Sequence, residues 1–362
     1  QYGGAQPAAA RLTLDAGRRR PRAAAITAEG RPMRLGVLAT IGSDWKQDLE
    51  RVRIAEDLGY AHVASGEAWG PSALPFLTLV AAHTSRVTVG TSILNCFSRS
   101  PAVLAQELAM LDQISGGRAV LGLGTSGAQV IEHFHGVPFA RPLRRIRETI
   151  EIFDALIAGD KLEYEGRIFR LERGFRLDYA RPRTKIPVWV AAISPRSIRQ
   201  AGEIADGVIP IHWPKQELAS LRADLESAAS AAGKSGKTFT IAPFTTVNVL
   251  DGNDDEAKWR EARQILFFYI NKMGSFYWQM LASHGYDVEV AASRKAFAER
   301  DTKASLAAIS ERMVRDLQCI GPVDEVRAQL RERAALGADL QLVYMPRGDV
   351  VSAARQLETL IA

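Results

Sequence analysis

The sequence predicts a (β/α)8 TIM barrel, an α/β fold in which eight parallel strands alternate with helices. Two observations carry this prediction. From Met33 onward, short β-rich runs alternate with longer amphipathic ones, and a chain of 362 residues has room for a barrel with additions. A doubly wound open sheet is the less favoured alternative. The strand candidates are 34–39, 62–65, 87–93, 119–123, 186–192, 207–211, 240–250 and 340–345.

Helical periodicity fills the intervals between these strands, and several helix ends carry the expected signals. The stretch 44–58 ends before Gly59, 102–114 follows Pro101, and 141–158 ends before Gly159. The same pattern predicts helices over 195–205, 216–232, 323–336 and 350–361.

Two segments exceed a minimal barrel. Residues 161–171 alternate with period two around Glu165-Gly166, as a surface hairpin would. Residues 254–318 form a long helical insertion with aromatic residues between 267 and 278. Those rings are interpreted as packing, and the alternative is a cap over the barrel mouth, where substrate pockets commonly lie.

Charge and composition exclude several classes of function. The formal net charge is +5, and residues 1–32 contribute six arginines against two acidic residues. We expect 1–32 to be a disordered extension and 33–362 to be the barrel domain. The near-neutral body argues against nucleic-acid binding, and no apolar run suits a membrane span or an export signal. Two distant cysteines and the histidine spacing indicate a reducing, cytoplasmic location and no metal site.

The stretch 121–136 leads from a buried strand into a loop of small residues. Gly122, Gly124, Ser126 and Gly127 keep bulk away from the backbone, so that several amides can face one phosphate. The pattern is neither a dinucleotide fingerprint nor a P-loop. Taken alone, it is equally consistent with an ordinary tight turn.

Several short segments, taken in order, resemble the bacterial luciferase-like family of flavin- and deazaflavin-dependent oxidoreductases. They are 55–60 (AEDLGY), 89–94 (VGTSIL), 111–118 (LDQISGGR), 122–125 (GLGT), 136–141 (GVPFAR), 164–167 (YEGR), 186–192 (IPVWVAA) and 201–207 (AGEIADG). The stretch 135–143 is more similar to the branch that uses the deazaflavin coenzyme F420 than to the FMN monooxygenases. The resemblance covers residues 33–362 and implies a luciferase-like barrel.

The resemblance also implies where a cofactor would bind. Its ring would lie at the carboxyl ends of the strands, against a non-proline cis peptide at Ser92-Ile93, and its phosphate on the loop after the fourth strand. The expected cofactor contacts are Ser65, Ser92, Ile93, Asn95, Thr125, Ser126, Gly127, Ala128, Gly136, Ala191, Ala192 and Ile193. In the loop, backbone and hydroxyl donors are both expected. Asn95 is expected to hydrogen-bond the ring's carbonyl edge.

Two residues are candidates for catalysis. Glu67 follows the second strand, where a carboxylate in an apolar pocket can have a raised pKa and move a proton beside a hydride step. A positioning hydrogen bond is the alternative for Glu67. His135 is expected to contact the cofactor or to donate a proton, or else to fix the loop. Some relatives that oxidise sugar phosphates or alcohols have Asp-His where this chain has Gly66-Glu67. Those relatives also have a glutamate two residues after the threonine of the loop, where this chain has Gly127. The resemblance therefore argues against a sugar-phosphate dehydrogenase.

The predicted function is hydride transfer between coenzyme F420 and a small organic substrate, because a deazaflavin carries hydride and not single electrons. An FMN-dependent luciferase-like monooxygenase is the first alternative. A catalytically silent barrel subunit is the second. The resemblance also favours a homodimer.

Overall fold

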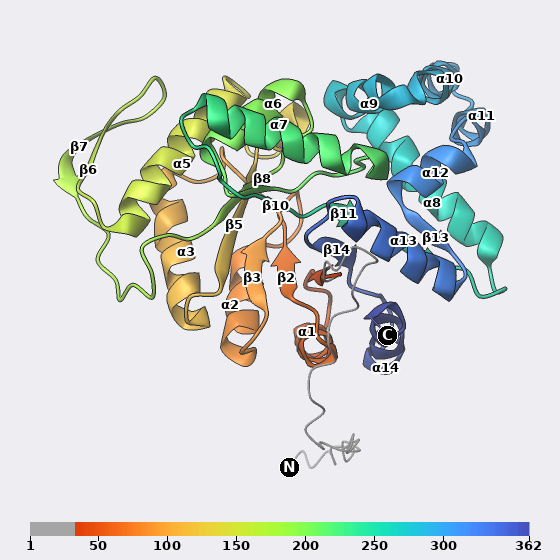
Figure 1. Cartoon of the computed structure of the whole chain (residues 1–362), viewed down its shortest axis with the longest axis horizontal. Coiled ribbons are helices and arrows are strands. Elements are labelled where there is room, and N and C mark those ends of the chain that lie inside the picture. The colour runs from red at the N-terminus through yellow and green to blue at the C-terminus, as the bar shows by residue number, and fades with distance from the viewer. Residues whose placement is uncertain (1–32, 362) are drawn as a thin grey trace, which may run out of the picture.

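The computed structural model describes residues 33–361, and the expected extension 1–32 lies outside them, as does residue 362. At its centre is a ten-stranded sheet that forms the predicted barrel (Figure 1). Its strands are β1 (Leu35–Leu38), β2 (His62–Ser65), β3 (Thr88–Thr91), β4 (Leu94–Asn95), β5 (Ala119–Gly124), β8 (Val188–Val190), β9 (Gly207–Val208), β10 (Thr240–Ile241), β11 (Phe244–Thr245) and β14 (Gln341–Tyr344). Neighbours follow the order β10-β9-β8-β5-β3-β2-β1-β14-β11, with β4 also beside β5, and all pair in parallel.

The barrel closes through the short segment that contains β10 and β11. On one side, the amide of Ala242 donates to the carbonyl of Val208 over 2.9 Å. On the other side, the amide of Leu342 donates to the carbonyl of Pro243, also over 2.9 Å. Because one stretch of chain bonds both ends of the sheet, β10 and β11 share one position in the barrel, as β3 and β4 do.

Eight helices surround the barrel and follow its strands in turn (Figure 1). They are α1 (Trp45–Leu58), α2 (Ala73–His83), α3 (Pro101–Ser115), α5 (Pro142–Ala158), α6 (Pro195–Ile204), α7 (Leu218–Ala231), α13 (Val323–Ala335) and α14 (Val350–Ile361). A single 3-10 turn, Lys215–Glu217, precedes α7. Local chemistry sets the ends of α1: the Asp44 carboxylate accepts the amides of Lys46 and Gln47, and Gly59 adopts the left-handed conformation.

Two helices have no counterpart in the sequence prediction. The first, α2, buries Leu74, Phe76, Leu77 and Val80 and is apolar on nearly every side, so it lacks the polar face that marks an amphipathic helix. The second is α4 (Ala128–His133), a short helix within the stretch that was interpreted as a loop.

The predicted surface hairpin is present and longer than expected. It consists of β6 (Leu162–Glu165) and β7 (Arg170–Phe175), which pair antiparallel. It extends from the barrel at the left of Figure 1. The carboxylate of Glu148, buried on α5, accepts the amides of Arg167, Ile168 and Phe169 at the hairpin turn.

The predicted strand 240–250 is wrong beyond Thr245. There β12 (Val247–Val249) leaves the barrel and pairs in parallel with β13 (Cys319–Gly321). Pro243 and the change of partner interrupt what the apolar pattern showed as one run. Between β12 and β13 lie α8 (Asp255–Lys272), α9 (Ser275–Leu281), α10 (Asp287–Ala298), α11 (Thr302–Ala307) and α12 (Glu311–Leu317), with the π-helical segment Ala282–Tyr286 joining α9 to α10. This confirms the predicted helical insertion.

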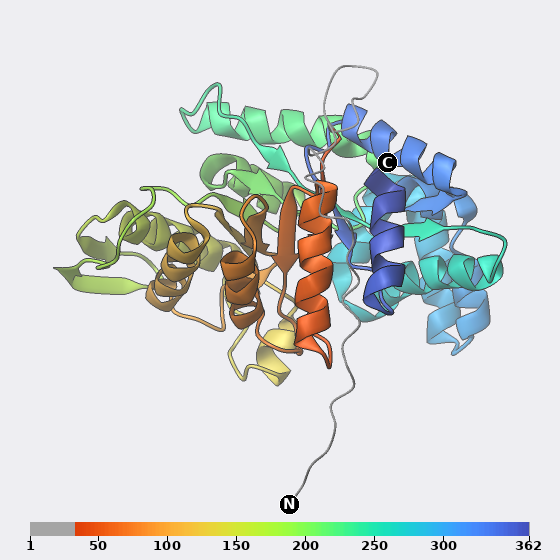
Figure 2. The same cartoon turned by 90° about the horizontal axis from the view of Figure 1, so that it is seen from below.

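The apolar side chains form two cores. A small cluster fills the inside of the barrel and includes Leu38, Val120, Trp189, Ile209 and Leu342. A larger cluster fills the space between strands and helices and continues into the insertion. In Figure 2, α14 lies beside α1, so the last helix completes the ring. None of the helices in the described part of the chain is both long and apolar enough to cross a membrane.

Candidate active site

The carboxyl ends of β2, β3, β5 and β8 gather most of the predicted cofactor contacts at one end of the barrel, which we call the mouth. The amide of Ser92 donates to the carbonyl of Ser65 over 2.7 Å, and the amide of Ala191 donates to the carbonyl of Leu123 over 2.9 Å. The amide of Cys96, next to Asn95, donates to the carbonyl of Gly124 over 2.9 Å. Segments that are far apart in the sequence therefore meet at the mouth.

The chain makes a bulge between β3 and β4, and the Ser92-Ile93 peptide there is cis, as the resemblance implies. Backbone atoms pack closely around the bulge. A Cβ on Gly66 would lie 2.2 Å from the Ser92 carbonyl oxygen, so only glycine fits beside it. The Ser92 hydroxyl is buried and has no hydrogen-bond partner among the described residues. A buried polar atom without a partner beside the mouth fits a site that receives a polar ring edge.

The loop after β5 presents backbone amides that the described protein does not use. Thr125, Ser126, Gly127 and Ala128 donate their amides to no group among residues 33–361. Ser126 adopts a left-handed conformation (φ 56°), and α4 begins at Ala128. An anion can bind to adjacent free amides of this kind, because each N–H can donate a hydrogen bond to it. The expectation that the Thr125 hydroxyl also donates is not met, because it already donates to the Ser126 carbonyl over 3.0 Å.

The end of β8 has the small side chains that the prediction required. Ala191 is half-buried, Ala192 is buried, and Ile193 is half-buried. Gly124 leaves room for its neighbours, because a Cβ there would lie 2.8 Å from the Ile93 side chain and 3.2 Å from that of Ala191. The backbone of β5 and β8 is thus open to close approach from the mouth.

Glu67 does not have the raised pKa that was expected. Burial disfavours its charged form, but hydrogen bonds from Arg99, the Ala73 amide and Ser72 outweigh that effect, and the pKa of Glu67 is lowered. The two terminal guanidinium nitrogens of Arg99 donate to the carboxylate of Glu67, over 2.7 and 2.9 Å. The expectation of a protonated acid is wrong, and the geometry matches the alternative, a positioning carboxylate.

Asn95 and His135 lie side by side, 3.4 Å apart between Nδ2 and Nε2. The Asn95 side-chain oxygen accepts the amides of Phe97 and Ser98, so it holds the turn after β4, and its amino group faces His135. His135 borders a cavity of about 340 Å³ that Glu67, Arg99 and Phe134 also line. Gly136, which follows, is exposed and has φ 68°.

An aromatic cluster lies at the mouth. It joins rings of the insertion, for which the sequence left a cap over the mouth as the alternative to packing, with His212 and Tyr344, whose place beside them was not expected. His212 follows β9, Tyr344 ends β14, and Tyr269 and Tyr277 come from α8 and α9. The His212 and Tyr269 rings are 4.3 Å apart, and the Tyr269 and Tyr277 rings are 4.8 Å apart. The available signal was position: His212 and Tyr344 lie at or just beyond predicted strand ends.

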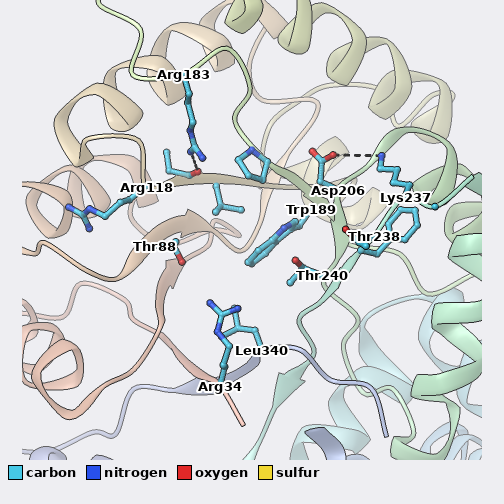
Figure 3. Close-up of a pocket in the computed structure, with 15 residues that line it drawn as sticks. Arg34, Thr88, Arg118, Arg183, Trp189, Asp206, Lys237, Thr238, Thr240 and Leu340 are labelled. Atoms are coloured by element: carbon cyan, nitrogen blue, oxygen red, sulfur yellow. Dashed lines mark hydrogen bonds and ion pairs between the residues drawn. The ribbon is translucent and has the colours of Figure 1, made fainter. Parts of the chain in front are cut away.

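A larger cavity, of about 680 Å³, lies at the opposite end of the barrel, among the first residues of the strands (Figure 3). Its walls include Arg118, Arg183 and Lys237. Arg118 donates to backbone carbonyls and to Thr84, Arg183 pairs with Asp112, and Lys237 faces Asp206. Because protein groups already pair with these three cations, we interpret them as stabilising the end of the barrel opposite the mouth. The predicted site residues lie at the other end.

Within residues 33–361, no three histidine, cysteine, aspartate or glutamate side chains are arranged to hold a metal ion. The donors at the mouth are instead backbone amides, an uncommitted hydroxyl and small side chains. Such a set fits a flat organic group that carries a phosphate.

The fold and the mouth together define an α/β-barrel protein in which a loop of uncommitted backbone amides lies at the carboxyl ends of the strands. The chain belongs to the luciferase-like monooxygenase family, whose sequence profile matches residues 26–340.

Named relatives support this assignment. A protein of Mycobacterium tuberculosis, provisionally named a coenzyme F420-dependent oxidoreductase, is 31% identical over 81% of this chain and 89% of its own length. The 5,10-methylenetetrahydromethanopterin reductase of Archaeoglobus fulgidus is 26% identical over 82% and 89%. Among solved structures, the coenzyme F420-dependent tetrahydromethanopterin reductase of Methanopyrus kandleri superposes with a TM-score of 0.76 at 22% identity and covers 91% of this chain and 98% of its own.

Proposed function

We propose that this protein is a coenzyme F420-dependent oxidoreductase that transfers a hydride between the deazaflavin and a small organic substrate. The row of unused amides at Thr125, Ser126, Gly127 and Ala128, beside the bulge at Ser92-Ile93, carries the proposal. The name of the M. tuberculosis relative supports the choice of cofactor, and the name of the A. fulgidus relative, a reductase, supports the reaction class.

Each part of the mouth has a role in this proposal. The amides of the 125–128 loop would hold the phosphate, the Ser92-Ile93 bulge would support the ring, and the small side chains of Ala191 and Ala192, with Ile193, would leave it room beside β8. When bound, the deazaflavin supplies a carbon that accepts or donates hydride. The apolar interior of the barrel and the insertion exclude water around that carbon.

The two candidate catalytic residues have different roles in this proposal. Glu67 is ionised and hydrogen-bonded to Arg99, so it orients that guanidinium and stabilises the wall of the cavity. His135 borders the same cavity and touches Asn95, so it is the proposed contact for the cofactor or the substrate.

Equilibrium titration of the protein with F420 and, separately, with FMN tests the cofactor. We expect F420 to bind clearly more tightly, with fluorescence as the readout. Tighter binding of FMN, with oxygen consumption, would establish the monooxygenase alternative. Failure to bind either cofactor would establish a silent barrel.

Substitution of one loop residue tests whether the amides of residues 125–128 bind the phosphate. Ala128 is the first residue of α4, where proline is tolerated and only the amide hydrogen is lost. Because a hydrogen bond to a charged group contributes about 1.5–3 kcal/mol, Ala128→Pro should weaken F420 binding by about 10- to 100-fold. The matched control is Glu311→Pro, at the first position of α12 in the insertion. Equal F420 affinity in the two variants would refute phosphate binding by the amides of residues 125–128.

A further inference from the structure

The cavity of about 680 Å³ at the end of the barrel opposite the mouth, which we call the basal cavity, reaches into the barrel (Figure 3). At its rim lies Thr238, which is exposed. Its inner walls include Val120, Trp189 and Leu340, which belong to the apolar cluster inside the barrel. The basal cavity therefore extends from the surface to the barrel interior. Its volume lies in the range of about 300–1,000 Å³ that small-molecule sites have.

Arg34 is the cation of the basal cavity that the described protein leaves without a partner. It directly precedes β1 and is exposed, and its guanidinium forms no hydrogen bond or ion pair with residues 33–361. In Figure 3 its side chain points into the cavity, toward Thr88 and Trp189. Burial and, after it, the charge of Arg34 lower the pKa of His62 to about 3. The guanidinium thus lies near the barrel interior with its donors unused.

Arg118 adds a second positive charge that forms no ion pair with the described residues. Its guanidinium donates only to uncharged groups, which are the carbonyls of Ala81, Thr84, Val87 and Ser115 and the Thr84 hydroxyl. These hydrogen bonds fix the side chain at the edge of the cavity but leave its charge without an opposite charge in contact. Arg118 therefore adds to the positive potential of the cavity while Arg34 offers the free donors.

The acidic side of the basal cavity is small and already committed. Asp206 is the one acidic residue among the walls that the structure describes. Its carboxylate lies 3.3 Å from Nζ of Lys185 and 3.6 Å from Nζ of Lys237, so two lysines share it. The walls as a whole carry four cations against this one acid, namely Arg34, Arg118, Arg183 and Lys237. An anion that enters the cavity would meet an excess of positive charge.

The chain's own N-terminal extension does not match the basal cavity in charge. Residues 1–32 precede Arg34 closely in the sequence, but they contribute six arginines against two acidic residues. Positive side chains would be repelled by the four cations of the walls. The charge of the cavity therefore favours a separate, anionic occupant.

We infer that the basal cavity binds a small organic anion, in which a carboxylate or phosphate group contacts Arg34 and an apolar ring contacts Trp189. A guanidinium suits either group, because its parallel N–H donors match two oxygens at once. An inorganic ion alone would leave most of the cavity, and its apolar inner wall, unfilled. The basal cavity and the mouth are at opposite ends of the barrel, so this inference does not depend on the proposed function.

Three probes of similar shape test the ligand chemistry. Benzoate, phenyl phosphate and benzamide each carry one benzene ring, and benzamide has no charge. Their binding to the full-length protein is measured by ligand-observed NMR. We expect both anions to bind and benzamide to bind at least about tenfold more weakly than benzoate, an effect of about 1.4 kcal/mol. The tighter of the two anions identifies the preferred group. Equal binding of benzamide, or no binding of either anion, would overturn the inference.

Variants of Arg34 test whether the anion binds in the basal cavity. Arg34→Gln should weaken binding of the tighter anion at least about tenfold, and Arg34→Lys should restore part of it. Because the Arg34 side chain is exposed and unpaired among residues 33–361, both variants should unfold at the midpoint of the unmodified protein. The matched control is Arg260→Gln, an exposed arginine on α8 outside the cavity. Equal anion affinity in Arg34→Gln and Arg260→Gln would overturn the inference.

Competition with F420 separates the basal cavity from the loop of residues 125–128, where an anion would also find free amides. The probe anion should bind equally well with and without saturating F420, and Ala128→Pro should leave its affinity unchanged. Displacement of the probe by F420 would place the anion at the mouth and overturn the inference. Failure of the unmodified protein to bind F420, with the probe still bound in an Arg34-dependent manner, would refute the proposed function alone.

Discussion

Single carboxylates that accept backbone amides recur in this protein and join elements that are distant in the sequence. Glu56, on α1, accepts the amides of Ser85, Arg86 and Val87 just before β3. Burial opposes the charge of Glu56, but these hydrogen bonds outweigh it and lower its pKa. Such groups act on stability through the turns that they hold, and not on chemistry. Sequence patterns do not distinguish them from catalytic acids.

Glu67 provides a pH-dependent test of this distinction. Its pKa is depressed below the usual value of 4.5, so its contribution to stability is present above that pH and is lost as the pH falls through the folded-state pKa. Glu67→Gln should lower the free energy of unfolding by about 1–3 kcal/mol at pH 7. The difference from the unmodified protein should shrink below pH 4.5, as measured by urea unfolding.

The control for Glu67 is Glu50→Gln, in an exposed pair with Arg53. Exposed pairs contribute about 0–1 kcal/mol, so little change is expected. A Glu67→Gln protein of normal stability, with turnover lost, would instead support the proton-transfer role first considered for Glu67.

Gly122, within β5, and Gly127, in the loop after it, differ in the space around them. A Cβ on Gly122 would lie 1.9 Å from the Thr91 carbonyl oxygen, whereas one on Gly127 would meet nothing within 4 Å. Gly122→Ala should lower the free energy of unfolding by about 3 kcal/mol through overpacking. Gly127→Ala should leave it nearly unchanged. The measurement is thermal unfolding of both variants. Equal unfolding midpoints would contradict the close packing of Gly122 against Thr91.

At the scale of elements, the hairpin depends on one side chain. Glu148 is fully buried and accepts the amides of Arg167, Ile168 and Phe169, which outweigh its burial and lower its pKa. Glu148→Ala should release the turn and cost about 1–3 kcal/mol for the unpaired amides. Hydrogen exchange should rise across 162–175 and remain low in β1 and β2. Glu165→Ala, on the exposed face, is the control; equal exchange in both variants would contradict this role.

Elements whose patterns were local could be predicted from the sequence, and those set by distant partners could not. Asp44 and Gly59 indicate the two ends of the helix α1 in the sequence. The alternation of apolar and polar residues indicates the hairpin. In contrast, α2 is buried on most sides and has no polar stripe. The run that ends at Leu250 has a uniform pattern, but Val247–Val249 pairs with Cys319–Gly321 outside the barrel, and nothing near residue 247 encodes that partner.

The same division holds in the candidate site. Strand ends and small residues located the 125–128 loop and Ala191, because barrels place their sites at one end of every strand. The charge state of Glu67 depends on Arg99, and the surroundings of the His212 ring depend on Tyr269 from the insertion. Those contacts appear only after the chain has folded.

At the scale of the whole molecule, the expected homodimer stays a proposal, and α3 offers a surface for it. Val103, Met110 and Ile114 are 41%, 54% and 40% exposed on this helix. Their spacing puts them on one side of α3. We expect a dimer by light scattering and a shift toward the monomer in Met110→Glu. Val288→Glu, at an exposed apolar position on α10, should leave the mass unchanged. A monomeric parent protein would contradict the proposal.

The parallel pairing of Val247–Val249 with Cys319–Gly321 has an evolutionary consequence. The two ends of the insertion, β12 and β13, lie next to each other. The insertion therefore begins and ends at one place beside the barrel. Replacement of everything between those two short strands would exchange the tyrosines of α8 and α9 while the strand ends at Ser92-Ile93 and Thr125 stay in place. The residues that the insertion contributes to the mouth can therefore change in one step, while the strands of the barrel and their ends are kept.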